Sequence, residues 1–363
     1  MGTRCLTLLT FLAMLACCAS PAFAADTSLL SSSVRLTPTA DACTQRGELD
    51  QMYCDETGSL TADLPKDPAQ WKDPGTLLFT CPPVEDPAIY KDAFADFMQF
   101  LEAGTGKRIM YYIVASNSAA VEAMRAGRLH IAGFSPGPTW FAVNLAGYVP
   151  LAVKGNEQAI QRSRTIVIAR ADSPLHGLAD LKGTKVAHSA PTAHSGHMAP
   201  LALFPGEGVI PGTDYRLEFS GGHGKSIHGV HAGDYDAACV PSDIFQRMAD
   251  AGRIKREEYK ILWQSSGLFP TASFGLAHDL HPDLAQKITN AFFAYRFPPA
   301  MQKLFGGADR FLPITYKDDW ALVALIAKAA SGKALDAAGL EKLRTLKEPQ
   351  AKKEREAGVP VGK

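Results

Sequence analysis

The stretch AGRLHIAGF (126–134) and the similar stretch AGDYDAACV (232–240) indicate how this chain folds. Each stretch has a glycine placed to end a helix, then two residues, then a run of small apolar side chains typical of a buried strand. Helical segments precede them at residues 118–125 and 225–231. The chain therefore uses one strand–helix unit twice, and strands alternating with helices predict two α/β lobes with parallel sheets.

Two β-rich segments between these units indicate how the lobes are joined. SRTIVIARAD (163–172) and PTASFGLAHDL (270–280) bracket residues 173–269, so the chain enters a second lobe and then returns to the first. Two crossing strands form a hinge, and in open α/β sheets ligands bind beyond the carboxyl ends of the strands. The predicted fold is an α/β protein with two lobes, a two-strand hinge and a ligand cleft between the lobes.

The rest of the domain organisation is predicted from composition and periodicity. The extension that follows the N-terminal leader is rich in Ser, Thr, Asp and Pro and has no sustained periodicity, so it is not expected to be a separate domain. The predicted parts are a signal peptide at 1–24, an N-terminal extension at 25–75, a first lobe at 76–168 plus 276–345, a second lobe at 169–275 and a polar tail at 346–363.

The overall composition is that of an ordinary soluble globular protein. The chain has 363 residues, of which 46% are hydrophobic and 20% charged, enough for two domains with buried cores. Lys plus Arg and Asp plus Glu number 37 each, so no overall charge favours nucleic acid or an anionic membrane. We predict a monomer with no nucleic-acid partner, in which any anion site is local.

The N-terminus, MGTRCLTLLTFLAMLACCASPAFA, predicts export. Arg4 supplies a positive charge, residues 6–16 form an apolar run too short to span a bilayer, and residues 22–24 form an A-x-A cleavage site. We expect a secretory signal peptide and a periplasmic mature protein, since no later apolar run reaches the ~20 residues of a spanning helix. Lipoprotein processing at Cys17 is the alternative, because MLAC is a passable lipobox.

Four cysteines remain after such cleavage. Cys43 and Cys54 lie close together in the polar extension, and in an oxidising compartment they are the natural disulfide pair. Cys81 and Cys239 end apolar runs in distant parts of the chain. We interpret them as buried free thiols, which behave as small hydrophobes.

Three strand-to-helix junctions offer the backbone N–H groups and hydroxyls that anions prefer. They are GFSPGPTWF (133–141), SAPTAHSGHMAP (189–200) and FSGGHGKSIHG (219–229). The G-K-S of the third is not a P-loop, because Phe219 stands where that motif requires its first glycine. Each junction alone is typical of an ordinary helix N-cap, but three around one predicted cleft favour an anion site.

The histidines of these junctions raise two other functions. His194 and His197 lie three residues apart, and His223, His228 and His231 follow in the next unit. No Asp, Glu or Cys stands at tight ligand spacing, so we predict neither a metal nor a cofactor. The sequence HSGH lacks the elbow of a serine hydrolase, so no enzymatic activity is predicted. A histidine in the cleft can instead donate hydrogen bonds to an oxyanion.

Four segments resemble the periplasmic substrate-binding proteins of phosphonate, phosphite and phosphate ABC transporters. They are GRLHIAGFSPGPTWFAV, RTIVIARADSPLHGLADLKGTKVAHSAPTAHSGHMAP, FSGGHGKSIHGVHAGDYDAACV and ILWQSSGLFPTASFGLAHDL, and the resemblance runs from about Leu77 to Ala330. It implies the type II periplasmic-binding-protein fold. It also implies capture of a small tetrahedral oxyanion and its delivery to an ABC importer, whose membrane permease is the partner.

The resemblance further implies where the ligand binds. The family holds the phosphorus oxygens with a Ser-Thr-Ser-Gly run at a helix N-terminus, and the matching residues here are Ala193, His194, Ser195 and Gly196, of which two agree. The pocket histidine of the family matches His223. With the aromatic wall and a later polar position included, the predicted ligand-binding residues are Tyr90, Ser135, Thr139, Trp140, Thr192, His194, Ser195, Gly196, His223, Ser242 and Asp243.

An alternative function comes from relatives of this family that are sensory. Such a protein presents arsenite, arsenate or another oxyanion to a membrane histidine kinase. Cys81 and Cys239 bear on this alternative, because both end strands expected to face the cleft and thiolates suit a soft metalloid.

Overall fold

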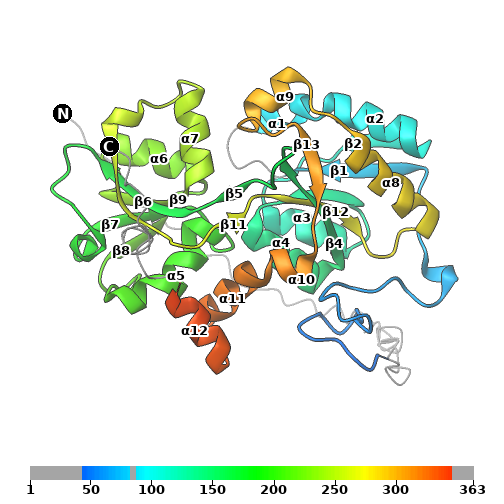
Figure 1. Cartoon of the computed structure of the whole chain (residues 1–363), viewed down its shortest axis with the longest axis horizontal. Coiled ribbons are helices and arrows are strands. Elements are labelled where there is room, and N and C mark those ends of the chain that lie inside the picture. The colour runs from blue at the N-terminus through cyan, green and yellow to red at the C-terminus, as the bar shows by residue number, and fades with distance from the viewer. Residues whose placement is uncertain (1–42, 82–86, 346–363) are drawn as a thin grey trace, which may run out of the picture. The chain divides into compact units, whose positions relative to one another are not determined.

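The computed structural model describes residues 43–81 and 87–345. The predicted signal peptide, the lipobox at Cys17, the extension up to residue 42 and the polar tail at 346–363 lie outside the described residues. Two separate sheets form the cores of two lobes (Figure 1). In the ranges that the structure describes, no helix has both the length and the apolar character needed to cross a membrane.

The first lobe is built on a six-stranded sheet of order β13-β4-β12-β3-β1-β2. Its strands are β1 (Thr76–Thr80), β2 (Arg108–Tyr111), β3 (Ile131–Phe134), β4 (Tyr148–Gly155), β12 (Ser273–Ala277) and β13 (Arg310–Pro313). Its helices are α1 (Pro87–Ala93), α2 (Ala95–Thr105), α3 (Asn117–Arg125), α4 (Pro136–Ala146), α8 (Pro282–Ala294), α9 (Pro299–Leu304) and α10 (Tyr316–Asp319). A cluster of buried phenylalanines, among them Phe79, Phe97 and Phe311, fills its core.

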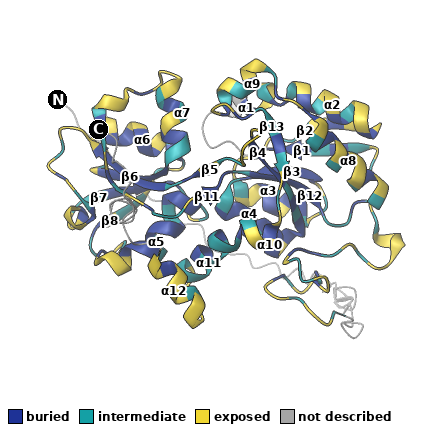
Figure 2. Cartoon of the chain, viewed as in Figure 1, coloured by how far each residue is buried: buried dark blue, intermediate teal, exposed yellow. Residues whose placement is uncertain are grey.

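The second lobe is built on a five-stranded sheet of order β10-β6-β9-β7-β8. Its strands are β6 (Thr165–Arg170), β7 (Lys185–His188), β8 (Arg216–Phe219), β9 (Ala237–Pro241) and β10 (Tyr259–Gln264). Its helical segments are the π-helical turn η4 (His194–Met198), α5 (Ala199–Leu203), α6 (His223–Ala232) and α7 (Ser242–Asp250). Figure 2 shows central strands such as β3 and β9 buried and the outer faces of the helices exposed, whereas the edge strand β8 has no buried residue.

A two-stranded antiparallel sheet links the lobes. It consists of β5 (Arg162–Ser163) and β11 (Phe269–Pro270), which lie between the two larger sheets (Figure 1). These strands belong to the crossing segments that the sequence predicts as a hinge. The predicted α/β class, with two lobes joined by two strands, is confirmed.

The crossing strands differ from the prediction in direction. The repeated units do pair in parallel, as β1 with β3 and β7 with β9. However, β6 and β12 run antiparallel to their neighbours, because each enters its sheet from the hinge and not through a crossover helix. The predicted lobe boundaries after residues 168 and 275 fall inside these two strands, which pair wholly within the second and first sheets respectively.

The C-terminal helices contact both lobes. Helix α11 (Ala321–Ala330) packs against α4 of the first lobe and against α5 and η4 of the second. The indole N–H of the buried Trp320 donates to the carbonyl oxygen of Pro136 at 3.1 Å, which anchors the start of α11 beside α4. At the end of α12 (Ala337–Thr345), the carbonyl oxygen of Thr345 accepts a hydrogen bond from Ser266 Oγ at 3.3 Å.

The described part of the extension is folded against the first lobe. The predicted disulfide between Cys43 and Cys54 is present, with a Cα–Cα distance of 5.5 Å. Arg125 of α3 forms an ion pair with Asp50 at 3.0 Å, and Lys72 pairs with Asp279 at 2.5 Å. These contacts hold the extension to α3 and to the segment that follows β12.

Candidate functional site

A small cavity of about 70 Å³ lies where the two lobes meet the hinge. We call it the inner cavity. Its walls come from three parts of the chain that are far apart in sequence. The first lobe contributes Cys81, Tyr90, Gly133, Ser135, Pro136, Lys154 and Phe305; the hinge region contributes Gln161, Ser163, Phe269, Pro270, Thr271 and Ala272; the second lobe contributes His194, Ser195, His223, Pro241, Asp243, Ile244 and Arg247.

Lys154 is a buried cation in the wall of the inner cavity. It lies on β4, only 8% exposed, and its Nζ stands over the rings of Phe305 at 4.7 Å and Phe274 at 5.3 Å. No carboxylate of a described residue lies within 4 Å of this Nζ. Burial lowers the pKa of Lys154 to about 8, although Cys81 and Asp243 raise it, so the ammonium group remains charged at neutral pH. A buried charge without a counter-ion is costly, and an anion in the cavity would pair with it.

Two histidines of the second lobe present neutral rings to the inner cavity. His194 begins η4 and His223 begins α6, and both are buried. Burial lowers the pKa of His194 to about 3 and that of His223 to about 4. Within the described residues, both ring nitrogens of His194, Nδ1 of His223 and the hydroxyl of Thr271 have no hydrogen-bond partner. Buried polar groups are normally paired, so this concentration at one cavity indicates a place for a ligand.

Near the inner cavity, two glycines lie so close to neighbouring atoms that a side chain at either position would collide with them. A Cβ at Gly196 would collide with Ser189 Oγ and would lie 3.0 Å from the His223 ring. A Cβ at Gly137, in the first turn of α4, would collide with the carbonyl oxygen of Thr192. The first contact lies within the second lobe, whereas the second joins the two lobes.

The structure brings together six of the predicted ligand-binding residues at the inner cavity. These six are Tyr90, Ser135, His194, Ser195, His223 and Asp243. Thr192 lines a larger chamber next to it, and Gly196 packs behind Ser189. Whether these residues contact a ligand stays a prediction.

Besides Gly196, three predicted residues line neither the inner cavity nor the larger chamber. Thr139 is buried, and its hydroxyl hydrogen-bonds with Ser273 Oγ at 2.7 Å. The Trp140 ring packs against Phe141 at 4.9 Å. Thr139 thus points into its own lobe, while Lys333 Nζ lies 5.5 Å from the centre of the Trp140 ring. Ser242 instead accepts a hydrogen bond from the backbone N–H of Arg164 at 3.0 Å, which ties the start of α7 to the hinge.

The two free cysteines are buried and lie in different places. Cys81 lines the inner cavity, and burial raises the pKa of its thiol to about 12. Cys239 is buried on β9, where burial also raises its pKa strongly, and its Sγ is 4.0 Å from His188 Nε2. The structure therefore brings one protonated thiol to the cavity, which gives no support to a metalloid site of two thiolates. Over the described ranges, no group of three His, Cys, Asp or Glu side chains is placed to hold a metal ion.

Sequence reasoning missed Lys154, Gln161, Thr271 and Arg247, which line the inner cavity as well. For Lys154 a signal existed. The strand sequence YVPLAVKG (148–155) is apolar apart from this one cation, and a lysine in a buried strand is unusual. The other three carry no local signal, because they reach the cavity only through the crossing of the hinge and the packing of α7.

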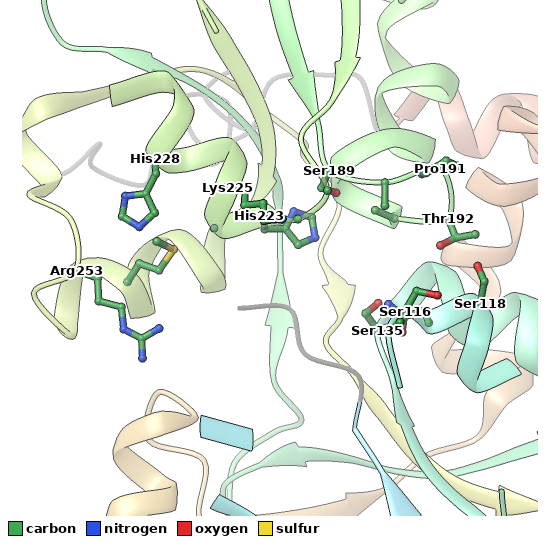
Figure 3. Close-up of a pocket in the computed structure, with 18 residues that line it drawn as sticks. Ser116, Ser118, Ser135, Ser189, Pro191, Thr192, His223, Lys225, His228 and Arg253 are labelled. Atoms are coloured by element: carbon green, nitrogen blue, oxygen red, sulfur yellow. The ribbon is translucent and has the colours of Figure 1, made fainter. Parts of the chain in front are cut away.

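A second space, of about 630 Å³, adjoins the inner cavity. We call it the outer chamber. Ser135 and His223 line both spaces. Figure 3 shows Ser116, Ser118 and Ser135 on the first-lobe side of the outer chamber and His223, Lys225, His228 and Arg253 on the second-lobe side.

Known proteins are similar to this chain in sequence and in fold. The chain is 29% identical over 230 residues to the phosphate-import protein PhnD of Mycolicibacterium smegmatis, a match that covers 60% of this chain and 71% of that protein. The solved binding protein of an ABC phosphonate transporter from Pseudomonas aeruginosa is similar with a TM-score of 0.62 at 20% identity, covering 79% of this chain and 99% of the other.

A second solved structure has the same fold. PhnD1 of Prochlorococcus marinus, solved in complex with methylphosphonate, matches with a TM-score of 0.63 at 15% identity over 71% of this chain and 99% of its own. The structural neighbours have the type II periplasmic-binding-protein fold. Residues 79–320 match the family model described as ABC transporter, phosphonate, periplasmic substrate-binding protein. This chain therefore belongs to the family of periplasmic substrate-binding proteins of phosphonate ABC transporters.

Proposed function

We propose that this protein is exported to the periplasm, captures a phosphonate, phosphite or phosphate in the inner cavity, and delivers it to an ABC importer. The observation that carries the proposal is Lys154, a buried ammonium group without a described counter-ion in a cavity of about 70 Å³. A tetrahedral oxyanion matches both the charge and the small size of this space.

The uncharged donors around Lys154 suit the same ligand. His194 and His223 each carry one ring N–H in the neutral form, and Ser195 and Thr271 add hydroxyls. These groups can surround the oxygens of one phosphorus centre from several sides. Hydrogen bonds from such donors to an ionised oxygen are stronger than those between neutral groups.

Asp243 would distinguish oxyanions that carry an O–H group from those that do not. Its carboxyl group also lines the inner cavity and can accept a hydrogen bond from a ligand that carries an O–H group. Monoanionic and dianionic oxyanions differ in the protons they present, and an unmatched buried donor or acceptor costs about 1–3 kcal/mol. The proteins from Mycolicibacterium and Prochlorococcus, whose names refer to phosphate import and to a methylphosphonate complex, support a ligand of this class.

Calorimetric titration of the mature protein tests the proposal. Phosphate, phosphite and methylphosphonate are the candidate ligands, and arsenite and a divalent metal are the comparison. Lys154→Met should weaken the bound oxyanion by roughly 30-fold or more, because loss of one partner from a buried charge pair costs about 2 kcal/mol or more. Lys317→Met, at an exposed lysine that donates to the carbonyl oxygen of Gly58, is the matched control and should bind normally.

Two results would reject oxyanion binding at this cavity: binding of arsenite or metal alone, or equal oxyanion affinity in Lys154→Met and the parent protein. Delivery needs a separate test. Deleting the gene should abolish cellular uptake of whichever oxyanion the protein binds, and undiminished uptake would remove the importer role.

A further inference from the structure

We propose that the outer chamber is a second recognition subsite, which binds an anionic substituent of an organophosphorus ligand. The ligand's phosphorus group would occupy the inner cavity, so this inference rests on the proposed function. It adds the substrate class: a phosphonate or phosphate ester with a second anionic group, in preference to the bare inorganic anion.

The two spaces form one continuous binding region. Ser135 of the first lobe and His223 of the second lobe line both the inner cavity and the outer chamber. The inner cavity, at about 70 Å³, has room for one small group, whereas the outer chamber measures about 630 Å³. A substituent on a phosphorus centre beside His223 would therefore extend into the outer chamber.

Among the described residues that line the outer chamber, the ionisable side chains are basic. Lys225, His228 and Arg253 line it, and none of its described lining residues is an Asp or a Glu. Lys225 Nζ lies beside the glycine turn before α6, 3.6 Å from where a Cβ on Gly221 would stand. Among the described residues, no carboxylate oxygen lies within 4 Å of Lys225 Nζ. Such a wall attracts an anionic substituent and repels a cationic one.

The start of α6 adds further donors to the same wall. This helix of ten residues begins at His223 without a side-chain cap and without an acidic residue in its first turn. Its first N–H groups carry positive partial charge, and the residues that bear them line the outer chamber.

A buried hydroxyl gives an independent sign of a ligand. Ser189 is 1% exposed, and its Oγ has no hydrogen-bond partner within the described residues, although it lines the outer chamber next to His223 (Figure 3). A buried hydroxyl is normally paired. Ser189 therefore lies beside His223 at the start of α6 (Figure 3), and its hydroxyl can donate to a ligand oxygen there.

Four phosphonates of similar length test the charge preference. Propylphosphonate has a neutral tail, 2-aminoethylphosphonate a cationic one and 3-phosphonopropionate a carboxylate, and 1,2-ethylenediphosphonate replaces that carboxylate by a second phosphonate. Titration of the mature full-length protein should give at least 10-fold tighter binding for one or both ligands with an anionic tail than for propylphosphonate. It should give the weakest binding for 2-aminoethylphosphonate. The tighter of the two anionic arms identifies whether a carboxylate or a phosphoryl group is preferred.

The affinity for an anionic-tail ligand divided by that for propylphosphonate measures how much each residue contributes to the charge preference. Lys225→Met should reduce the preference for the anionic tail from at least 10-fold to about 2-fold. Lys255→Met, at an exposed lysine of the same lobe that pairs with Glu258, should leave the ratio as it is. Equal affinities for the neutral and anionic tails, or a ratio that survives Lys225→Met, would overturn the subsite while leaving oxyanion binding in place. Failure of phosphate, phosphite and methylphosphonate to bind at all would instead overturn the proposed function, and the subsite with it.

Discussion

At the scale of single residues, the environment of Lys154 sets the pH range in which the site works. Burial lowers the pKa of this lysine to about 8, well below its ordinary value near 10.5, because the surroundings disfavour the charged form. Below pH 8 the ammonium group is charged in both the folded and the unfolded protein, so its full burial penalty is present. Between about pH 8 and 10.5 the folded protein loses this proton first, and the penalty disappears as pH rises.

We predict that oxyanion affinity falls as pH rises above about 8, because the charged partner of the ligand is then lost. Titration calorimetry between pH 7 and 10 measures this decline in the parent protein. Lys154→Met should bind weakly at every pH with a flatter profile, and comparison with it removes the effect of the ligand's own ionisation. A parent protein whose affinity stays constant across this range would show that Lys154 does not pair with the ligand.

Among the structural elements, the disulfide loop packs against α3, whereas the first turn of α4 forms a contact between the lobes. The bond between Cys43 and Cys54 closes a loop with a sequence separation of 11 in the extension. That loop contacts α3 through Asp50 and Arg125. None of the residues at 43–75 lines either the inner cavity or the outer chamber. The described part of the extension, residues 43–75, therefore packs on the first lobe away from both spaces.

We expect the double variant Cys43→Ala/Cys54→Ala to destabilise the extension by about 3 kcal/mol, the chain-entropy value for a loop of this length. Hydrogen exchange should show faster exchange of backbone amides in residues 43–75, while ligand affinity stays within about 2-fold. Loss of ligand binding in a protein whose lobes remain folded would assign the extension a role at the site.

The first turn of α4 comes close to the second lobe at Gly137. Helix α4 begins at Pro136, and Gly137 in its first turn meets the backbone of Thr192 across the lobes. Any side chain there would force the lobes apart, because the obstructing atom is a backbone carbonyl oxygen that cannot rotate away.

We predict that Gly137→Ala weakens oxyanion binding by 10-fold or more without unfolding either lobe. Titration calorimetry gives the affinity, and circular dichroism checks that secondary structure is retained. Gly177→Ala, where a Cβ meets no atom within 4 Å, is the matched control. Normal affinity in Gly137→Ala would mean that this contact is not needed for binding.

At the scale of the whole molecule, the described chain places the inner cavity beside its hinge. Strands β5 and β11 connect the sheets, and the cavity walls combine both lobes with this connection. Helix α11 then contacts α5 and η4 of the second lobe after the chain has returned to the first. Movement of the lobes about the hinge would therefore change the cavity, the outer chamber and the α11 contacts together.

Part of the candidate site could be predicted from sequence because its residues lie in local motifs. His194, Ser195 and His223 follow strands at junctions whose glycines and hydroxyls are readable, and they do line the inner cavity. Thr139 and Trp140 lie in a similar junction but line neither the inner cavity nor the outer chamber. The difference is the rotation of α4, which depends on packing between distant segments and has no local signal.

Local patterns in the sequence were enough to predict the fold class, the two crossing strands, the disulfide and the family. Those properties follow from short-range patterns of apolar residues, glycines and cysteines, and from motifs in a characteristic order. Long-range packing was needed to show that Lys154, Thr271 and Arg247 line one cavity and that Cys239 lies outside it. These residues come from a strand, a hinge segment and a helix that are far apart in the chain, and long-range packing alone brings their side chains to a common space.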